Sequence, residues 1–238
     1  MTYKILNLTV DKEPYIEFDR VKRKYYRKNN VNFSFIYNDC EDYNYVEDKE
    51  DVMYRIGLSD DYQHRLNNTY MNDAGIPAML NKFIAEISKP EYEEYDYIIR
   101  SNSSSFINIF NLEKTLNSGV IGPSNYGGWH YDKQFFGMSF MSGTMIIIPK
   151  QIISKINSQD ISRYSHHCDD VALGYIIEEM CNGIPVALPS PHICMSSDID
   201  YIRHYIDDNL FLRIRADGIA RNNQRDIDIW RAIEKIKC

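Results

Sequence analysis

Long hydrophobic runs are absent from this sequence, and cysteine is scarce. No stretch of about 18 apolar residues, the length that spans a bilayer, occurs anywhere. Residues 1–10 carry too short an apolar stretch for a signal peptide. The five cysteines stand at irregular spacings without a Cys-x-x-Cys pair, so neither a disulfide framework nor a structural zinc site is expected. We therefore expect a soluble protein without a membrane anchor in the reducing cytoplasm.

Two common nucleotide-binding signatures are also missing. The sequence has neither a P-loop nor a Gly-rich dinucleotide fingerprint, which argues against other α/β enzymes such as nucleotidyltransferases or methyltransferases. The formal net charge of −7 argues against non-specific binding to nucleic acid. One basic run, residues 20–28, departs from this balance. A solvated helix face explains it better than a surface for an anionic ligand or a membrane.

The composition that remains is that of a packed globular protein. Hydrophobic residues make up 44% and charged residues 26% of the 238 residues, a length that suits a single domain over residues 1–238. The chain opens with a predicted β-α-β unit, with a strand at 5–10, a helix at 16–27 and a strand at 32–37. The acidic, tyrosine-rich residues 38–53 have no clear period and predict a loop or insertion.

Strands and helices alternate along the rest of the chain, which predicts an α/β fold. Helices are expected at residues 75–87, 149–156, 169–180 and 226–236, and strands at 95–100, 119–122, 140–148, 185–188 and 211–214. The glycine-rich and aromatic residues 123–132 predict a mobile loop. The polar residues 101–105 follow a strand, where open α/β sheets place their ligands.

Three short polar motifs stand beside predicted strands in a fixed order. They are Arg-Ser-Asn-Ser-Ser-Ser-Phe at 100–106, Ser-Gly-Thr at 142–144 and Asp-Asp-Val-Ala-Leu-Gly at 169–174. Together they resemble the β-1,3-galactosyltransferases and Fringe-like enzymes, which carry a DxD motif, a Ser-Gly-x-Gly strand and Glu-Asp-Val-x-x-Gly in this order. The resemblance covers roughly residues 75–195. It looks closest to small viral and bacterial GT-A proteins with Arg-Ser/Thr-Asn-x-Ser-Ser-Phe in place of DxD.

This resemblance implies a GT-A fold, Rossmann-like, with a mixed central sheet flanked by helices. It also implies an inverting transfer of a hexosyl or deoxyhexosyl group from a nucleotide sugar, UDP-linked in the usual case, to a hydroxyl of a glycan or glycoprotein. Such a transfer needs a base, and the resemblance assigns that role to Asp170 with Asp169 beside it to orient it or raise its pKa. Gly174 then allows the backbone or the acceptor sugar to approach closely. The competing interpretation is that both acids only cap the helix that follows.

The two metal-binding carboxylates of the family are replaced here by Asn102 and Ser104. Because hard cations prefer charged oxygens, a Mn²⁺ or Mg²⁺ site at these residues is expected to be weak, with His192 as a further candidate ligand. Three interpretations remain, in order of preference: arginine and lysine stabilise the diphosphate instead of a metal, a weak metal site persists, or the chain is an inactive binding module. The candidate cations are Lys82, Arg100, Arg215, Arg221 and Arg225, although surface ion pairing alone explains any single arginine.

The resemblance places further contacts around this centre. Thr9, Val10 and Asp11 end the first strand, where a GT-A protein meets its nucleotide. Ser142 and Gly143 are expected in the sugar pocket. Trp129, His130 and Tyr131 either stack on a sugar or base or pack the loop onto the core.

Overall fold

A computed structural model describes residues 1–10, 13–38, 49–54, 76–131, 139–157, 160, 169–217 and 223–238. Its main sheet has seven strands in the order β3-β2-β1-β4-β7-β6-β8. Their bounds are β1 (Tyr3–Leu8), β2 (Asn32–Asn38), β3 (Asp51–Tyr54), β4 (Tyr97–Asn102), β6 (Asn125–Tyr131), β7 (Phe140–Pro149) and β8 (Ile184–Ala187). Strands β1 to β4 are mutually parallel, and β7 runs antiparallel to both β4 and β6. The predicted mixed central sheet is therefore confirmed.

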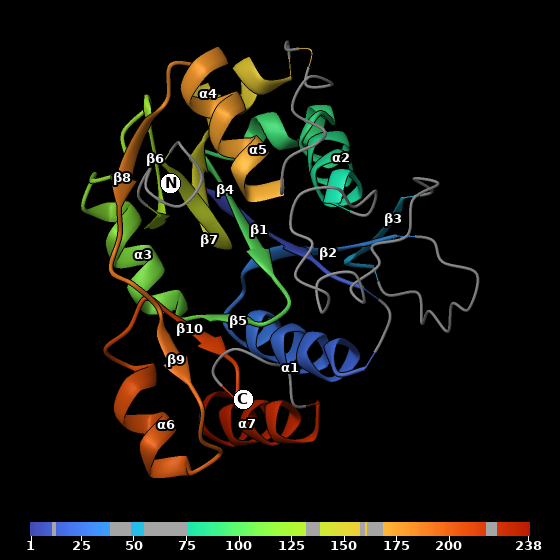
Figure 1. The fold of residues 1–238 in the computed structure, drawn as a ribbon, viewed down its shortest axis with the longest axis vertical. Helices are drawn as coiled ribbons and strands as arrows, with labels where there is room; N and C mark the ends of the chain where they lie inside the picture. Colours follow the sequence, from blue (N-terminus) through green and yellow to red (C-terminus); the bar gives the residue numbers. More distant parts are fainter. Residues whose placement is uncertain are drawn as a thin grey trace.

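Helices cover both faces of this sheet (Figure 1). One core joins the sheet to α1 (Tyr15–Lys28), α3 (Ile109–Asn117), α6 (Ile199–Ile206) and α7 (Asn223–Lys237). The other joins it to α2 (Ile76–Ile87), α4 (Lys150–Ile156), α5 (Asp169–Tyr175) and the π-helical turn η4 (Ile176–Met180) that continues α5. A short 3₁₀ helix, η2 (Pro90–Glu94), leads into β4. All ten residues of β7 are buried, as expected for a strand covered on both faces.

A second, three-stranded sheet lies beside the end of β4. It contains β5 (Ser105–Ile107), β10 (Phe211–Ile214) and β9 (His192–Cys194), in the order β5-β10-β9. Strand β10 is antiparallel to β5 and parallel to β9. The backbone N–H of Ile214 also donates to the carbonyl of Ser104 at 2.8 Å. This sheet brings the C-terminal part of the chain against the polar residues that follow β4.

Most predicted elements are confirmed with shifts of one or two residues, but three predictions are wrong. Residues 51–53 of the expected 38–53 loop belong to β3, whereas residues 39–48 of that loop lie outside the described residues. Residues 119–122 are irregular and form no strand. The expected loop at 123–132 is largely β6. A Cβ on Gly128 would lie 2.5 Å from the Met145 carbonyl, and one on Gly127 would lie 2.3 Å from Ile121. These glycines thus allow close packing of a strand and do not form a turn.

The basic run is only partly the solvated face that the sequence predicts. Arg20 and Lys24 are half exposed and pair with Glu234 on α7, at 2.6 and 3.0 Å. Lys22, in contrast, is fully buried. In the part of the chain that the structure describes, no helix is long and apolar enough to cross a membrane.

Candidate functional site

The polar residues gather where β1 and β4 end side by side. Strand β1 connects to β2 on one side, whereas β4 lies on the other, so this edge is a topological switch point of the sheet. Ligands of open α/β sheets bind at such points. Ser103 donates to the carbonyl of Leu8 at 3.3 Å and thereby ties the two strand ends together. The predicted nucleotide-binding residues at 9–10 and 101–104 therefore lie at one edge.

Thr9, Asp19, Lys22 and Lys82 form a fully buried group that we call the β1 cluster. The Thr9 hydroxyl donates to Asp19 Oδ2 at 2.5 Å, and Lys82 Nζ donates to the Thr9 carbonyl at 3.0 Å. Burial raises the pKa of Asp19 and lowers the pKa of Lys22, because both charged forms lose water. Lys82, a predicted phosphate contact, binds the backbone at the end of β1. Val10 follows Thr9 and is half-buried; Asp11 lies outside the described residues.

Lys22 is a site residue that the sequence interpretation missed. Its Nζ donates to the Asn102 carbonyl at 2.7 Å and to Asn7 Oδ1 at 3.2 Å, which places a lysine directly under the end of β4. Phe18 and Tyr25 are also buried, and with Lys22 they repeat at helical spacing. That spacing was the signal that Lys22 faces inward.

Residues 102–105, which include the altered metal motif expected from the resemblance, fold back on themselves. Asn102 Oδ1 accepts hydrogen bonds from the hydroxyls of Ser104 at 3.0 Å and Ser105 at 2.7 Å. Both lone pairs of the amide oxygen are therefore used within the chain. Ser101 is buried and donates to the Thr144 carbonyl on β7 at 3.4 Å. The polar run thus forms a closed turn between β4 and β5.

The two adjacent acids at the start of α5 have different surroundings. Asp169 is buried and forms an ion pair with Arg100, whose side chain is 3% exposed. Asp170 is half-buried, and its carboxylate accepts from Gly143 N at 3.1 Å and from Val171 N at 3.0 Å. We call Arg100, Gly143, Asp169 and Asp170 the α5 cluster. The guanidinium of Arg100, which is expected from the sequence to bind phosphate, is buried against Asp169 in this structure.

Gly143 packs directly against Arg100. A Cβ at this position would lie 2.3 Å from Arg100 Nη1, so a larger residue would displace the buried guanidinium. The glycine of the Ser-Gly motif therefore lets a guanidinium lie against β7. This contact, together with the Gly143 hydrogen bond to Asp170, links both acids of α5 to the same peptide of β7.

A second missed residue, Arg213 on β10, reaches the same strand. Its Nη1 donates to Thr144 Oγ1 at 2.6 Å, and Thr144 Oγ1 lies 2.8 Å from Ser142 Oγ. Burial raises the pKa of the Tyr131 phenol; Arg213 and Arg215 oppose this effect, and Asp170 adds to it. The two arginines and Asp170 therefore share one neighbourhood around Tyr131. Alternation with the buried Leu212 and Ile214 was the available signal for Arg213.

The expected aromatic residues lie on strand β6. Tyr131 stacks on Phe140 with ring centroids 5.3 Å apart, and Trp129 lies 4.7 Å from Tyr131. Trp129 also packs against the main core, whereas His130 is half-buried. Tyr131 packs against Phe140 and Val171, and Val171 is the residue that follows Asp170.

The remaining predicted ligands are His192, Arg225 and Arg221. His192 Nε2 lies 2.8 Å from the Tyr201 hydroxyl, and its ring stacks on Tyr205 at 3.6 Å. Burial lowers the pKa of His192. Arg225, in the first turn of α7, pairs with Asp217 at 2.5 Å. Arg221 lies outside the described residues.

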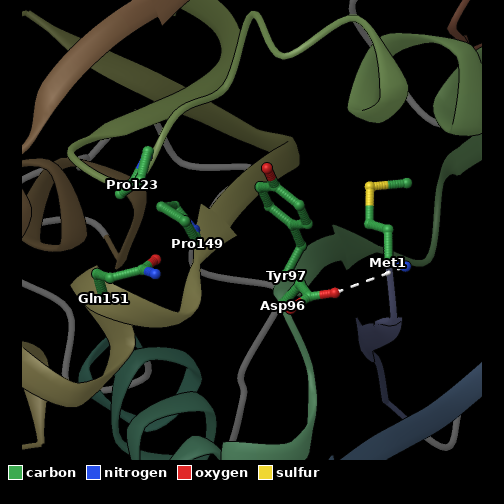
Figure 2. Close-up of a pocket in the computed structure, with 6 residues that line it drawn as sticks. All are labelled: Met1, Asp96, Tyr97, Pro123, Pro149 and Gln151. Atoms are coloured by element: carbon green, nitrogen blue, oxygen red, sulfur yellow. Dashed lines mark ion pairs between the residues drawn. The ribbon is translucent and has the colours of Figure 1, made fainter.

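The opposite edge of the sheet carries a pocket with none of these groups (Figure 2). Its lining residues are Met1, Asp96, Tyr97, Pro123, Pro149 and Gln151. Tyr97 begins β4 and Pro149 ends the antiparallel β7, so this pocket lies a strand's length from Asn102. The pocket is therefore separate from the candidate site, which is the carboxyl edge of β1 and β4.

The fold is similar to that of solved glycosyltransferases. The galactosyltransferase LgtC, in complex with donor and acceptor sugar analogs, matches 96% of this chain and 95% of its own with 12% identity and a TM-score of 0.52. A glycosyltransferase involved in the glycosylation of the major capsid of PBCV-1 matches 93% and 98% with 11% identity and a TM-score of 0.48. No protein-family model and no curated protein matches the sequence. The likeness to LgtC over nearly the whole of both chains shows that this chain has a GT-A fold.

Proposed function

We propose that this protein is a glycosyltransferase that moves a hexosyl or deoxyhexosyl group from a nucleotide sugar to a hydroxyl of a glycan or glycoprotein. A UDP-linked donor and inversion at the anomeric carbon are part of the proposal. The observation that carries it is the carboxylate of Asp170, half-buried and oriented by the Gly143 N–H at 3.1 Å, beside the switch point of a GT-A fold. A general base needs such an oriented carboxylate within reach of its substrate.

In the proposed reaction the acceptor oxygen attacks the anomeric carbon on the side opposite the diphosphate. The new glycosidic bond forms as the bond from the anomeric carbon to the diphosphate oxygen breaks, and the nucleoside diphosphate leaves with that electron pair. Asp170 takes the proton of the acceptor hydroxyl. Asp169 acts as a positioning residue, because its ion pair with Arg100 and the packing of Arg100 on Gly143 fix the peptide that orients Asp170.

The donor is proposed to lie across the switch point. The nucleotide contacts Thr9, Val10 and Asp11 at the end of β1, and its diphosphate passes the turn formed by residues 101–104. The sugar lies toward Ser142, Gly143 and Tyr131, which places its anomeric carbon near Asp170. The direct support is that the described members of this set meet at one edge of the sheet.

A divalent cation, which the resemblance implies, does not fit the candidate ligands that the structure describes. Asn102 Oδ1 is already the acceptor for two hydroxyls, and one of them is that of Ser104, the second residue of the altered motif. His192 is held by Tyr201 and Tyr205. No group of three or more His, Cys, Asp or Glu side chains in the described ranges suits a metal ion. No step of the proposed reaction is therefore assigned to a metal.

A second candidate is an inactive module that binds a nucleotide sugar or a glycan. The observation that favours it is the neutral, internally bonded Asn102 at the position where the family carries an acid. The two functions differ in whether a bound donor is ever consumed, so one set of measurements decides between them.

The test compares transfer by the wild type and by Asp170→Asn with a panel of nucleotide sugars and glycan acceptors. Loss of the base is expected to lower the transfer rate about 100-fold or more with unchanged thermal stability. The matched control is Asp198→Asn, because Asp198 also accepts a backbone N–H at a helix start, at 2.8 Å, but lies at α6. An Asp170→Asn protein as active as wild type would contradict the proposal. Donor binding without any transfer would favour the binding module.

A further inference from the structure

We propose that Arg213 and Arg215 bind the donor diphosphate in place of a divalent cation, an inference that rests on the proposed function. A leaving diphosphate needs compensating positive charge, which the neutral side chains of Asn102 and Ser104 in the altered motif do not supply. Arg213 on β10 and Arg215, the residue that follows this strand, are two cations of the described chain beside both this motif and Asp170.

Strand β10 is fixed against the altered motif through its backbone. The Ile214 N–H donates to the Ser104 carbonyl at 2.8 Å, and Arg213 is paired in register with Ser105. Leu212 and Ile214 are fully buried, whereas Arg213 and Arg215 alternate with them and are half-buried. Because side chains alternate between faces along an extended chain, Arg213 on β10 and Arg215 directly after it are expected on the same side.

That side faces the start of α5. Arg213 Nη1 reaches Thr144 Oγ1 at 2.6 Å, and the neighbouring residue Gly143 donates its N–H to Asp170. Arg213 and Arg215 lower the pKa of the Tyr131 phenol, and Asp170 raises it. Arg213 therefore lies between the turn that follows β4 and the proposed base, which is the path that the diphosphate takes in the proposed reaction.

The chemistry of the guanidinium suits this task. It stays protonated at any physiological pH and presents planar N–H donors that match two phosphate oxygens at once. Two such groups carry the same total charge as one divalent cation. Unlike a metal ion, these guanidinium groups need no carboxylate ligands to hold them. Neutral residues such as Asn102 and Ser104 can therefore stand where the DxD acids would be.

The direct test is binding of ADP, CDP, GDP and UDP by calorimetry, first with EDTA and then with Mn²⁺. We expect one of these nucleotides to bind in EDTA, with a Kd that changes less than about threefold when Mn²⁺ is added, since a factor of three is a small part of one charged contact. Binding that appears only with Mn²⁺ would overturn the proposal. Absence of binding by all four nucleotides would overturn it as well.

The variants Arg213→Gln and Arg215→Gln should each weaken the bound nucleotide about 10- to 100-fold, the worth of a hydrogen bond to a charged group. Arg213→Lys, which keeps the charge without the fork, should lie between Arg213→Gln and wild type. The matched control is Arg203→Gln on the exposed face of α6, which should bind like wild type. Thermal melting checks the fold of each variant, and affinity unchanged in both folded Gln variants would overturn the proposal.

These measurements separate the two proposals because they need no turnover. A protein that binds the nucleotide in EDTA through its arginines but never transfers a sugar upholds the diphosphate site and contradicts the transferase. Sugar transfer that requires Mn²⁺ and survives both arginine changes upholds the transferase and overturns the diphosphate site.

Discussion

The α5 cluster and the β1 cluster both bury charge at the same edge of the sheet, but they are built differently. In the α5 cluster a guanidinium and a carboxylate form a buried ion pair, and the adjacent Asp170 stays half-buried. In the β1 cluster the two lysines donate to neutral oxygens, and every charged group is buried. The β1 cluster therefore stabilises the strand ends through buried contacts, whereas the α5 cluster leaves one carboxylate partly exposed.

The largest effect is expected when the ion pair of the α5 cluster is broken. Asp169→Ala leaves the buried Arg100 without its carboxylate partner, a change that typically costs about 3–5 kcal/mol. Equilibrium denaturation should show this loss of stability as a lower midpoint at an unchanged slope.

The matched control removes both charges at once. Because apolar replacement of a whole buried pair is often nearly neutral, Arg100→Met combined with Asp169→Leu should recover most of the lost stability. A cost below about 1 kcal/mol for Asp169→Ala would show that the pair contributes no more than an exposed one, and the contrast between the clusters would fail.

A smaller effect is expected in the β1 cluster. Lys22→Met keeps a similar shape but leaves Asn7 Oδ1 and the Asn102 carbonyl without this donor, a cost of about 1–3 kcal/mol. Lys24→Met on the same helix is the control. Lys24 is half exposed, so its removal should cost about 0.5 kcal/mol or less.

The pH dependence of this variant has a defined sign. Burial lowers the pKa of Lys22 in the folded state, so above that pKa the native protein binds fewer protons than the unfolded chain. Wild-type stability should therefore rise with pH toward the usual lysine pKa of about 10.4, and the Lys22→Met protein should lack this contribution. The gap between the two proteins must widen from pH 7 to pH 9; a constant gap would contradict a buried lysine.

The sequence predicted the framework of both clusters because that framework depends on local periodicity. Apolar spacing located β1, β4, β7 and α5, and the order of the polar motifs placed Asp170 and Gly143 together. Interactions over long sequence distances were not predictable in this way. The pairing of Arg100 with Asp169 joins residues 69 positions apart, and nothing local in residues 100–106 indicates that the arginine points at α5 and not at a ligand.

The two missed cations have different causes. Lys22 lies in a basic run whose composition favoured a solvated helix face, although the helical spacing of the buried residues turns Lys22 inward. Arg213 lies on a four-residue strand, and its place beside Thr144 depends on the pairing of β10 with β5. The glycines at 127 and 128 were interpreted as turn residues because tight strand packing and turns favour the same residue type.

The exposed charges between α1 and α7 should give the smallest effect and thus calibrate the buried clusters. Hydrogen bonds from Arg20 lower the pKa of Glu234 to about 2, so its contribution is present above the usual glutamate pKa of about 4.3 and is lost as the pH falls toward 2. Arg20 and Lys24 are half exposed, so solvent and salt screen the contribution to about 1 kcal/mol or less. Denaturation of Glu234→Gln should show this loss at pH 7 and low salt, and none in 1 M salt or at pH 2. A salt-resistant loss as large as that of Asp169→Ala would mean that burial does not separate these clusters, because an exposed network would then stabilise the fold as strongly as a buried pair.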